Sequence, residues 1–361
     1  MAEYRHYKPG ASASEMKFII AHILLLGISF AFTNIVINQL ISSRHWNPDK
    51  GEVDAKLAAF NSSDKAQNLL IFGSSHIDYG LNPLVLDETL AANNVKSKSF
   101  NLACEGMTVS ERRFLLSRAL ELSAVKPCYV LVEFELRATP LVSNLTASRT
   151  RYFSSLKYVP AAFNTKFYSE RPFKQRVLPS GVIAIAAVLN QLNLGVLADI
   201  AFPNVNLNSS DKLKTCADFS SVGWKDGKSR YGNRNLPLIS KHIKIANSST
   251  SSPRQLTESE YFTIANDLRL ITQAGCIPVV VFPPSCSGID EDHSIRNAIL
   301  TKNPEVIILD FTVGSEGWPS FTSSDMWFDT SHLSADGATV FSELVGSRLS
   351  SIIPQVITGP E

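Results

Sequence analysis

Short apolar runs alternate with segments of helical periodicity at both ends of this 361-residue chain. Each apolar run has the length of a buried strand, and the segments between the runs place apolar residues at helical spacing. The expected strands are Leu69–Phe72, Ser99–Ala103, Tyr129–Phe134, Ile277–Phe282 and Val306–Asp310. Strands that alternate with helices are joined by right-handed crossovers and form a parallel sheet. The pattern therefore predicts an α/β fold with helices on both faces of one sheet.

The expected helices are Pro83–Leu90, Val109–Leu122, Glu258–Ala274, Asp290–Lys302 and Ala335–Leu349. Gly275 is expected to cap the third of these helices at its carboxyl end. From about 140 to 253 the alternation stops, and an expected helix at Gly181–Leu194 precedes a polar segment rich in Asn and Ser. We interpret this stretch as an insertion that covers the carboxyl end of the sheet and shapes a groove for substrate. The predicted fold is a flavodoxin-like, three-layer parallel sheet with a large insertion.

The segment from Phe18 to Ile41 contains no Asp, Glu, Lys or Arg. Its 24 residues make about 36 Å of α-helix, enough to span a bilayer. The sequence predicts a single transmembrane helix, and a signal peptide cleaved near Ser29-Phe30-Ala31 is the alternative. The expected organisation is a tail (1–17), the transmembrane helix (18–41), a connector (42–66) with a helical patch at Ala55–Phe60, the α/β domain (67–350) and a second tail (351–361). The domain is expected on the extracytoplasmic side of the cell membrane.

Composition excludes several classes of function. Hydrophobic residues make up 44% of the chain, charged residues 19%, and the formal net charge is +1. This balance has no basic excess that would bind phosphates, so nucleic acid is not an expected partner. The five cysteines are an odd number without the spacing of a metal site. We therefore expect neither a disulfide framework nor a metal ion, and no cofactor.

Two short motifs carry the candidate chemistry. Gly73-Ser74-Ser75-His76 follows the first expected strand, and Asp329-Thr330-Ser331-His332 precedes the last expected helix. Acyl transfer needs a nucleophile, an imidazole that accepts its proton and a carboxylate that orients the imidazole. We predict that Ser75, His332 and Asp329 fill these three roles, because loops that follow parallel strands open on one edge of the sheet. His76 is expected to point elsewhere.

With Gly106, which follows the second strand in Asn101-Leu102-Ala103-Cys104-Glu105-Gly106, these motifs resemble the blocks of the SGNH (GDSL-like) hydrolase superfamily. The resemblance covers about 67–137 and 257–349. It implies that Ser75 is the nucleophile, that Asp329 and His332 are the acid/base pair, and that the backbone N–H groups of Ser75 and Gly106 form the oxyanion hole. Ser74 stands where many members have Asp, which resembles the membrane-anchored branch that includes teichoic acid D-alanyl transfer proteins and alginate O-acetyltransferases.

The chain departs from this family at the third block. Members usually show Gly-x-Asn-Asp, whereas this chain has Glu133-Phe134-Glu135-Leu136-Arg137, so the Asn that donates a third oxyanion hydrogen bond is missing. Such a loss costs about 3 kcal/mol in related chemistry. Arg137 either substitutes as a donor, binds an anionic substrate, or forms an ion pair with Glu133 or Glu135. Arg137 and Trp224, in the insertion, are the candidate substrate-binding residues.

Three functions follow as expectations. The first is a membrane-anchored O-acyltransferase that moves an acetyl group onto a cell-surface or secreted polysaccharide. The resemblance implies that it works with a multi-spanning membrane-bound O-acyltransferase. The second is an esterase or deacylase that uses water as the acceptor. The third is a glycan-binding assembly protein without catalysis, on a degenerate scaffold.

Overall fold

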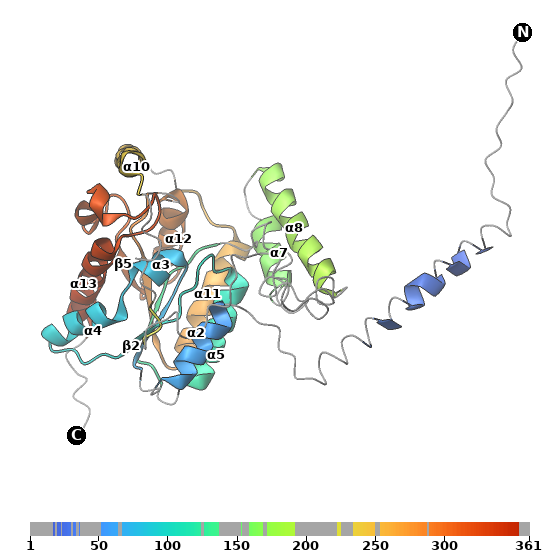
Figure 1. The fold of residues 1–361 in the computed structure, drawn as a ribbon, viewed down its shortest axis with the longest axis horizontal. Helices are drawn as coiled ribbons and strands as arrows, with labels where there is room; N and C mark the ends of the chain where they lie inside the picture. Colours follow the sequence, from blue (N-terminus) through green and yellow to red (C-terminus); the bar gives the residue numbers. More distant parts are fainter. Residues whose placement is uncertain are drawn as a thin grey trace, which may run out of the picture.

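The computed structural model describes residues 52–63, 67–123, 126–136, 159–168, 172–191, 222–224, 234–249, 253–286 and 289–353, with Phe153 and several residues between 17 and 36. Five strands form one parallel sheet in the order β2-β1-β3-β4-β5 (Figure 1). The strands are β1 (Leu69–Phe72), β2 (Ser99–Asn101), β3 (Tyr129–Val132), β4 (Ile277–Phe282) and β5 (Ile307–Asp310). The predicted flavodoxin-like α/β fold with an all-parallel sheet is confirmed.

The strands β1 and β3 end at the same level of the sheet. Phe72 of β1 pairs with Val132 of β3, and Val132 in turn pairs with Val280 of β4. One residue beyond this register, the backbone N–H of Glu133 donates to the carbonyl oxygen of Phe72 at 3.0 Å. The loops after β1 and β3 therefore begin side by side.

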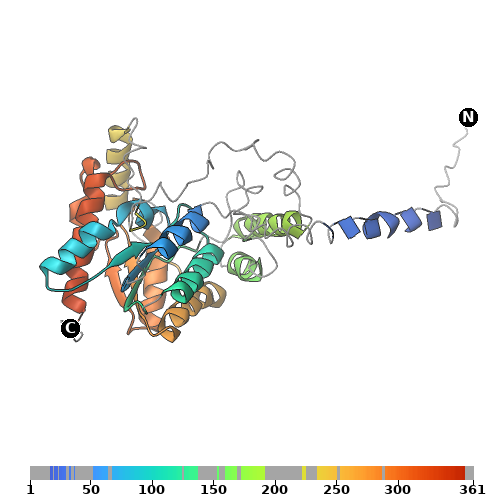
Figure 2. The same ribbon diagram turned by 60° about the horizontal axis from the view of Figure 1, so that its bottom comes forward.

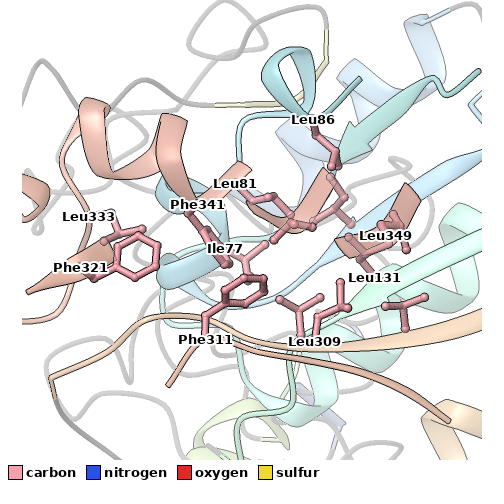
Figure 3. Close-up of a cluster of buried hydrophobic side chains, with 14 of the residues drawn as sticks. Ile77, Leu81, Leu86, Leu131, Leu309, Phe311, Phe321, Leu333, Phe341 and Leu349 are labelled. Carbon is pink, nitrogen blue, oxygen red and sulfur yellow. The ribbon is translucent and has the colours of Figure 1, made fainter. Parts of the chain in front are cut away.

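Two hydrophobic cores lie on opposite faces of the sheet, because successive side chains of a strand point to opposite faces. Leu69, Ile71 and Leu131 face one core and Leu70, Phe72 and Val132 face the other. Figure 3 shows Leu131 and Leu309 of the sheet beside side chains from the covering helices. The first face is covered by α3 (Ser75–Gly80), α4 (Pro83–Ala92), α10 (Leu236–Ser248) and α13 (Ala335–Ile352). The second is covered by α2 (Glu52–Ser62), α5 (Val109–Leu122), α11 (Glu258–Gln273) and α12 (Ile289–Lys302).

Helix caps explain why several predicted boundaries are accurate. Thr108 and Glu111 form a capping box at the start of α5, and Thr257 and Glu260 form another at the start of α11. Gly275, just after α11, has a φ of +81°, the left-handed conformation that glycine adopts at low cost. The predicted glycine cap is confirmed.

Other elements differ from the prediction. The helical patch in the connector is the longer helix α2, whose Val53 and Phe60 are fully buried in the second core. In the insertion, α8 (Phe173–Gln191) begins eight residues before the expected helix, and its predicted end lies outside the described residues. It packs beside α7 (Val159–Phe167), which lies against α5 and α11 (Figures 1 and 2). The helices α3, α7 and α10 were not predicted.

The described residues between Lys17 and Val36 are helical, and their apolar side chains are exposed. In the part of the chain that the structure describes, no helix has the length and apolar character needed to cross a membrane. Several residues of the predicted transmembrane helix 18–41 lie outside the described residues.

Candidate active site

The loop after β1 places Ser75 at the carboxyl edge of the sheet as the first residue of α3. Ser74 is the N-cap of this helix, and its Oγ accepts the backbone N–H of His76 at 3.3 Å. Gly73 makes the turn possible, because a Cβ at this position would lie 2.6 Å from Ile77 Cγ1 and 2.7 Å from Glu133 Oε2. A side chain at 73 therefore cannot be accommodated without displacing the start of α3.

The loop before α13 is held in a closed conformation. Trp327 is fully buried, its indole N–H donates to the carbonyl oxygen of Phe321 at 2.7 Å, and its backbone forms an antiparallel bridge with Leu333. Inside this bridge, the backbone N–H of Phe328 donates to the carbonyl oxygen of His332 at 2.9 Å. These contacts fix the four residues between Phe328 and Leu333, which include both members of the predicted acid/base pair.

Ser75, His332 and Asp329 lie within hydrogen-bonding distance in the predicted order. His332 Nε2 is 2.8 Å from Ser75 Oγ, and His332 Nδ1 is 2.9 Å from Asp329 Oδ2. Asp329 Oδ1 also accepts the backbone N–H groups of Ser331 and His332, at 2.7 and 2.8 Å. With Nδ1–H donated to the carboxylate, Nε2 is left to accept the hydroxyl proton of Ser75.

The environment of Asp329 favours its ionised form. Burial alone would raise the pKa of this carboxyl, but the hydrogen bond and charge of His332, together with the two backbone N–H groups, lower the pKa below its ordinary value. A carboxylate that stays ionised holds the imidazole in one tautomer and stabilises the imidazolium that forms when the proton moves.

His76 lies beside this group, and its Nδ1 contacts Ser74 Oγ, at 3.3 Å, and Glu133 rather than Ser75. Its ring centroid is 5.4 Å from that of His332. Its Nδ1 lies 3.3 Å from Glu133 Oε1, while Glu133 Oε2 accepts the backbone N–H of Ser74 at 2.5 Å. The sequence marked Glu133 as a departure from a family pattern and as a possible partner of Arg137, and no spacing rule links it to His76, 57 residues away.

The pKa values of His76 and Glu133 move in the directions that favour an ion pair. Burial alone would lower the pKa of His76, but the hydrogen bond and charge of Glu133 outweigh it and raise this pKa. Burial alone would raise the pKa of Glu133, but His76 and Ser74 outweigh it and lower this pKa. Burial and the charge of Glu133 raise the pKa of Asp292 well above its ordinary value. Glu133 is therefore the favoured site of negative charge in this group.

Aromatic side chains enclose His332 on two further sides. The ring centroid of Phe328 lies 5.7 Å from that of His332 in a stacked arrangement, and the ring of Tyr79 approaches edge-on at 5.9 Å. The imidazole nevertheless keeps 21% of its side-chain area exposed. The His332 imidazole is therefore flanked by aromatic rings but remains accessible to solvent.

Gly106 lies in the loop after β2, next to the loop that carries Ser75. The backbone N–H of Cys104 donates to the carbonyl oxygen of Gly73 at 3.1 Å, which joins the two loops two residues before Gly106. Gly106 has a φ of +59°, a conformation that glycine adopts readily. Among the described residues, the backbone N–H groups of Ser75 and Gly106 have no hydrogen-bond acceptor. Both N–H groups remain available to a ligand oxygen.

The two candidate substrate-binding residues have different outcomes. Arg137 lies outside the described residues, so its three alternative roles remain predictions. The indole N–H of Trp224 donates to the carbonyl oxygen of Tyr79 at 3.4 Å, and Val222, two residues earlier, accepts the backbone N–H of Asn101 at 2.9 Å. This part of the insertion therefore returns to the edge of the sheet and to α3, whose Tyr79 contacts His332.

One group of three carboxylates, from Glu52, Asp78 and Glu105, lies close enough within the described ranges to resemble a metal site. Lys56 already provides a counter-charge there, because its ammonium lies 2.7 Å from Asp78 Oδ1 and both side chains are fully buried. None of these three carboxylates is part of the relay formed by Ser75, His332 and Asp329.

No family model matches the sequence, and no curated protein matches it. What the site does has to be inferred from the arrangement of its own residues.

Proposed function

We propose that the protein is an acyltransferase that carries an acyl group on Ser75 and passes it to a hydroxyl group of a polysaccharide. The observation that carries this proposal is the relay from Ser75 Oγ through His332 to Asp329, with distances of 2.8 and 2.9 Å. A hydroxyl, an imidazole and a carboxylate in this order form the arrangement used for acyl transfer through an ester on serine.

The first half-reaction forms the acyl-enzyme. Ser75 Oγ attacks the carbonyl carbon of the donor ester while His332 Nε2 accepts the hydroxyl proton. The carbonyl oxygen becomes an oxyanion, which the backbone N–H groups of Ser75 and Gly106 stabilise. When the bond to the leaving oxygen breaks, His332 returns the proton to the leaving alcohol. Asp329 keeps the imidazolium oriented throughout.

The second half-reaction repeats these steps with the acceptor. A sugar hydroxyl loses its proton to His332, its oxygen attacks the acyl carbon, and Ser75 leaves with the proton. Water performs the same step and gives an esterase instead. The 21% exposure of the His332 side chain favours this second candidate function, because water can reach the base.

The placement of the protein at the membrane is part of the proposal. The charge-free segment 18–41 supports a single anchor, and Ser74, at the position where many SGNH members have Asp, resembles the membrane-anchored branch of that superfamily. On this basis the domain lies on the extracytoplasmic side, and a multi-spanning O-acyltransferase hands it acyl groups from across the bilayer.

Turnover of an activated acetyl ester tests the proposal. Ser75→Ala is expected to abolish ester cleavage. Ser74→Ala, a matched change at the neighbouring serine, removes the helix cap and the 3.3 Å contact of Ser74 Oγ with His76 Nδ1, and should retain ester cleavage. A glycan acceptor added at saturating concentration should divert the acetyl group from water to sugar. Equal activity of wild type and Ser75→Ala would contradict the proposed nucleophile, and hydrolysis undiminished by every acceptor would favour the esterase.

A further inference from the structure

The helix α8 presents an apolar face that no described residue covers. Its exposed side chains include Phe173, Leu178, Ile185 and Val188, with exposed fractions of 71, 60, 55 and 54%. Val177 is also exposed, and the spacing of these residues places them along one side of the helix. A soluble protein seldom exposes apolar side chains in so continuous a row, and such a row marks a surface of interaction.

The opposite side of α8 is firmly packed. Ser180, Ile183 and Ala186 are buried, and Ile183 forms a small apolar cluster with Ala162 of α7. Because α7 lies against α5 and α11, α8 is held on the domain through α7 (Figure 2), and its apolar face is left exposed. The exposure of this face is a consequence of how the helix packs.

The charges on α8 are all positive. The helix contains no Asp or Glu, and Lys174 and Arg176 stand near its amino end. Cations are disfavoured there, because the helix dipole places partial positive charge at the amino end. Neither side chain forms an ion pair with a described residue, and the Arg176 guanidinium lies 6.0 Å from the centroid of the Phe173 ring. Lys174 is exposed within the apolar face, and Arg176 is half-buried at its edge, where its guanidinium lies near Phe173. Both positive charges support binding of an anionic surface.

We propose that α8 docks on a phospholipid bilayer with anionic headgroups, with Phe173, Leu178, Ile185 and Val188 in the interfacial region and Lys174 and Arg176 at the headgroups. An exposed apolar helix face flanked by basic residues is the arrangement of an interfacial helix. A lipid surface is favoured over a second copy of the chain, because two copies of this face would bring their positive charges together. The inference rests on the proposed membrane placement, and not on the chemistry at Ser75.

Docking of α8 would fix the orientation of the domain on the membrane. The helix lies beyond α7, on the side of the domain away from α4 and α13 (Figures 1 and 2). A single anchor leaves the domain free to rotate, whereas a second contact through α8 would hold α4 and α13 away from the lipid.

A fluorescent label that reports a lipid environment tests this inference on the full chain in nanodiscs. Ile185→Cys on α8 carries the label, and Ile245→Cys on α10, also about half exposed (50%), is the matched control. The background from the native cysteines is measured on the wild-type chain. In nanodiscs of phosphatidylcholine with phosphatidylglycerol, the label at 185 should shift to the blue and be quenched at least two-fold more by doxyl-labelled lipid than the label at 245.

The charges give a second measurement. Lys174→Gln with Arg176→Gln should lower the docking equilibrium about 25-fold in anionic nanodiscs, or about five-fold for each charge, the equivalent of about 1 kcal/mol. In nanodiscs of pure phosphatidylcholine, the docking equilibrium of the unchanged helix should be lower by the same factor. Because the anchor is unaltered, a change in quenching reports α8 alone.

Equal quenching at 185 and 245 in anionic nanodiscs would overturn the inference. A label at 185 that is shielded in detergent and insensitive to doxyl lipid would also overturn it, because another segment of the chain or a protein partner would then cover α8. Acylation of Ser75 separates the two proposals. The α8 variants should still be acylated at Ser75, and the Ser75→Ala protein should still show doxyl quenching of the label at 185.

Discussion

Asp329 performs two tasks with one side chain. Its Oδ1 accepts the backbone N–H groups of Ser331 and His332, and its Oδ2 accepts from the His332 ring at 2.9 Å. The first task shapes the loop and the second orients the base. A substitution that keeps a single acceptor oxygen can therefore preserve the loop while it removes the negative charge.

Asp329→Asn is expected to reduce kcat for an activated acetyl ester by about 10³- to 10⁴-fold, because the amide cannot stabilise the imidazolium or the correct tautomer. The unfolding midpoint should change little. Asp325→Asn, at an exposed position of the same loop, is the control and should retain full activity. Near-normal turnover by the Asp329 variant would contradict the assigned role.

Glu133 and His76 contribute stability only where both are charged. The lowered pKa of Glu133 adds stability that is present above its ordinary value of 4.5 and is lost as the pH falls through the folded-state pKa. The raised pKa of His76 adds stability that is present below 6.5 and is lost as the pH rises through the folded-state pKa. The ion pair is therefore strongest between about pH 4.5 and 6.5.

Glu133→Gln should reduce the free energy of unfolding by about 1.5 to 3 kcal/mol within this window, the range for hydrogen bonds to charged groups. The difference from wild type should shrink on both the acidic and the alkaline side. Urea unfolding of both proteins across the pH range measures it. A difference that grows steadily toward high pH would contradict the ion pair.

At the scale of elements, the turn from β1 into α3 depends on Gly73. Gly73→Ala should cost activity, because its Cβ would displace Ile77 and Glu133 and move Ser75 away from His332. Gly181→Ala, inside α8, meets no atom within 4 Å and should stabilise the protein by about 0.5 to 1 kcal/mol through helix propensity. Ester turnover and thermal unfolding of the two variants measure the contrast, and an active, stable Gly73→Ala would refute the steric argument.

The sequence predicts elements well where periodicity and caps agree. Val109–Leu122 and Ile277–Phe282 have the predicted bounds, since Thr108 caps the first and Pro283 follows the second. The helix α3 escaped prediction because six residues are too short to show a period. In the site, Asp329 and His332 are linked by local spacing, whereas the contact of Glu133 with Ser74 and His76 exists only once β1 and β3 pair.

At the scale of the whole molecule, Lys56 joins parts of the chain that are distant in sequence. From α2, its ammonium donates to Asp78 Oδ1 of α3 at 2.7 Å, to the carbonyl oxygen of Asn101 at 3.4 Å, and to that of Gly223 in the insertion. Since the lysine is fully buried, these partners replace the water that it loses on folding.

Lys56→Met should lower the free energy of unfolding by about 3 to 5 kcal/mol, because it leaves the buried Asp78 carboxylate without its lysine. Adding Asp78→Asn should recover part of this loss. Denaturant unfolding of the single and double variants measures the coupling. If the double variant is less stable than the sum of the single changes predicts, the ion pair is not the main role of Lys56.

The proposed acyl transfer depends most on Ser75 as the acyl carrier. Its most direct test is to mix the protein briefly with an activated acetyl ester, quench in acid, digest and locate the added acetyl group by peptide mass spectrometry. We predict acetylation of Ser75 in the wild type, faster accumulation than in His332→Ala, and none in Ser75→Ala, with Ser74→Ala still labelled. Acetyl groups found only on other residues, or unchanged labelling in His332→Ala, would contradict the central claim.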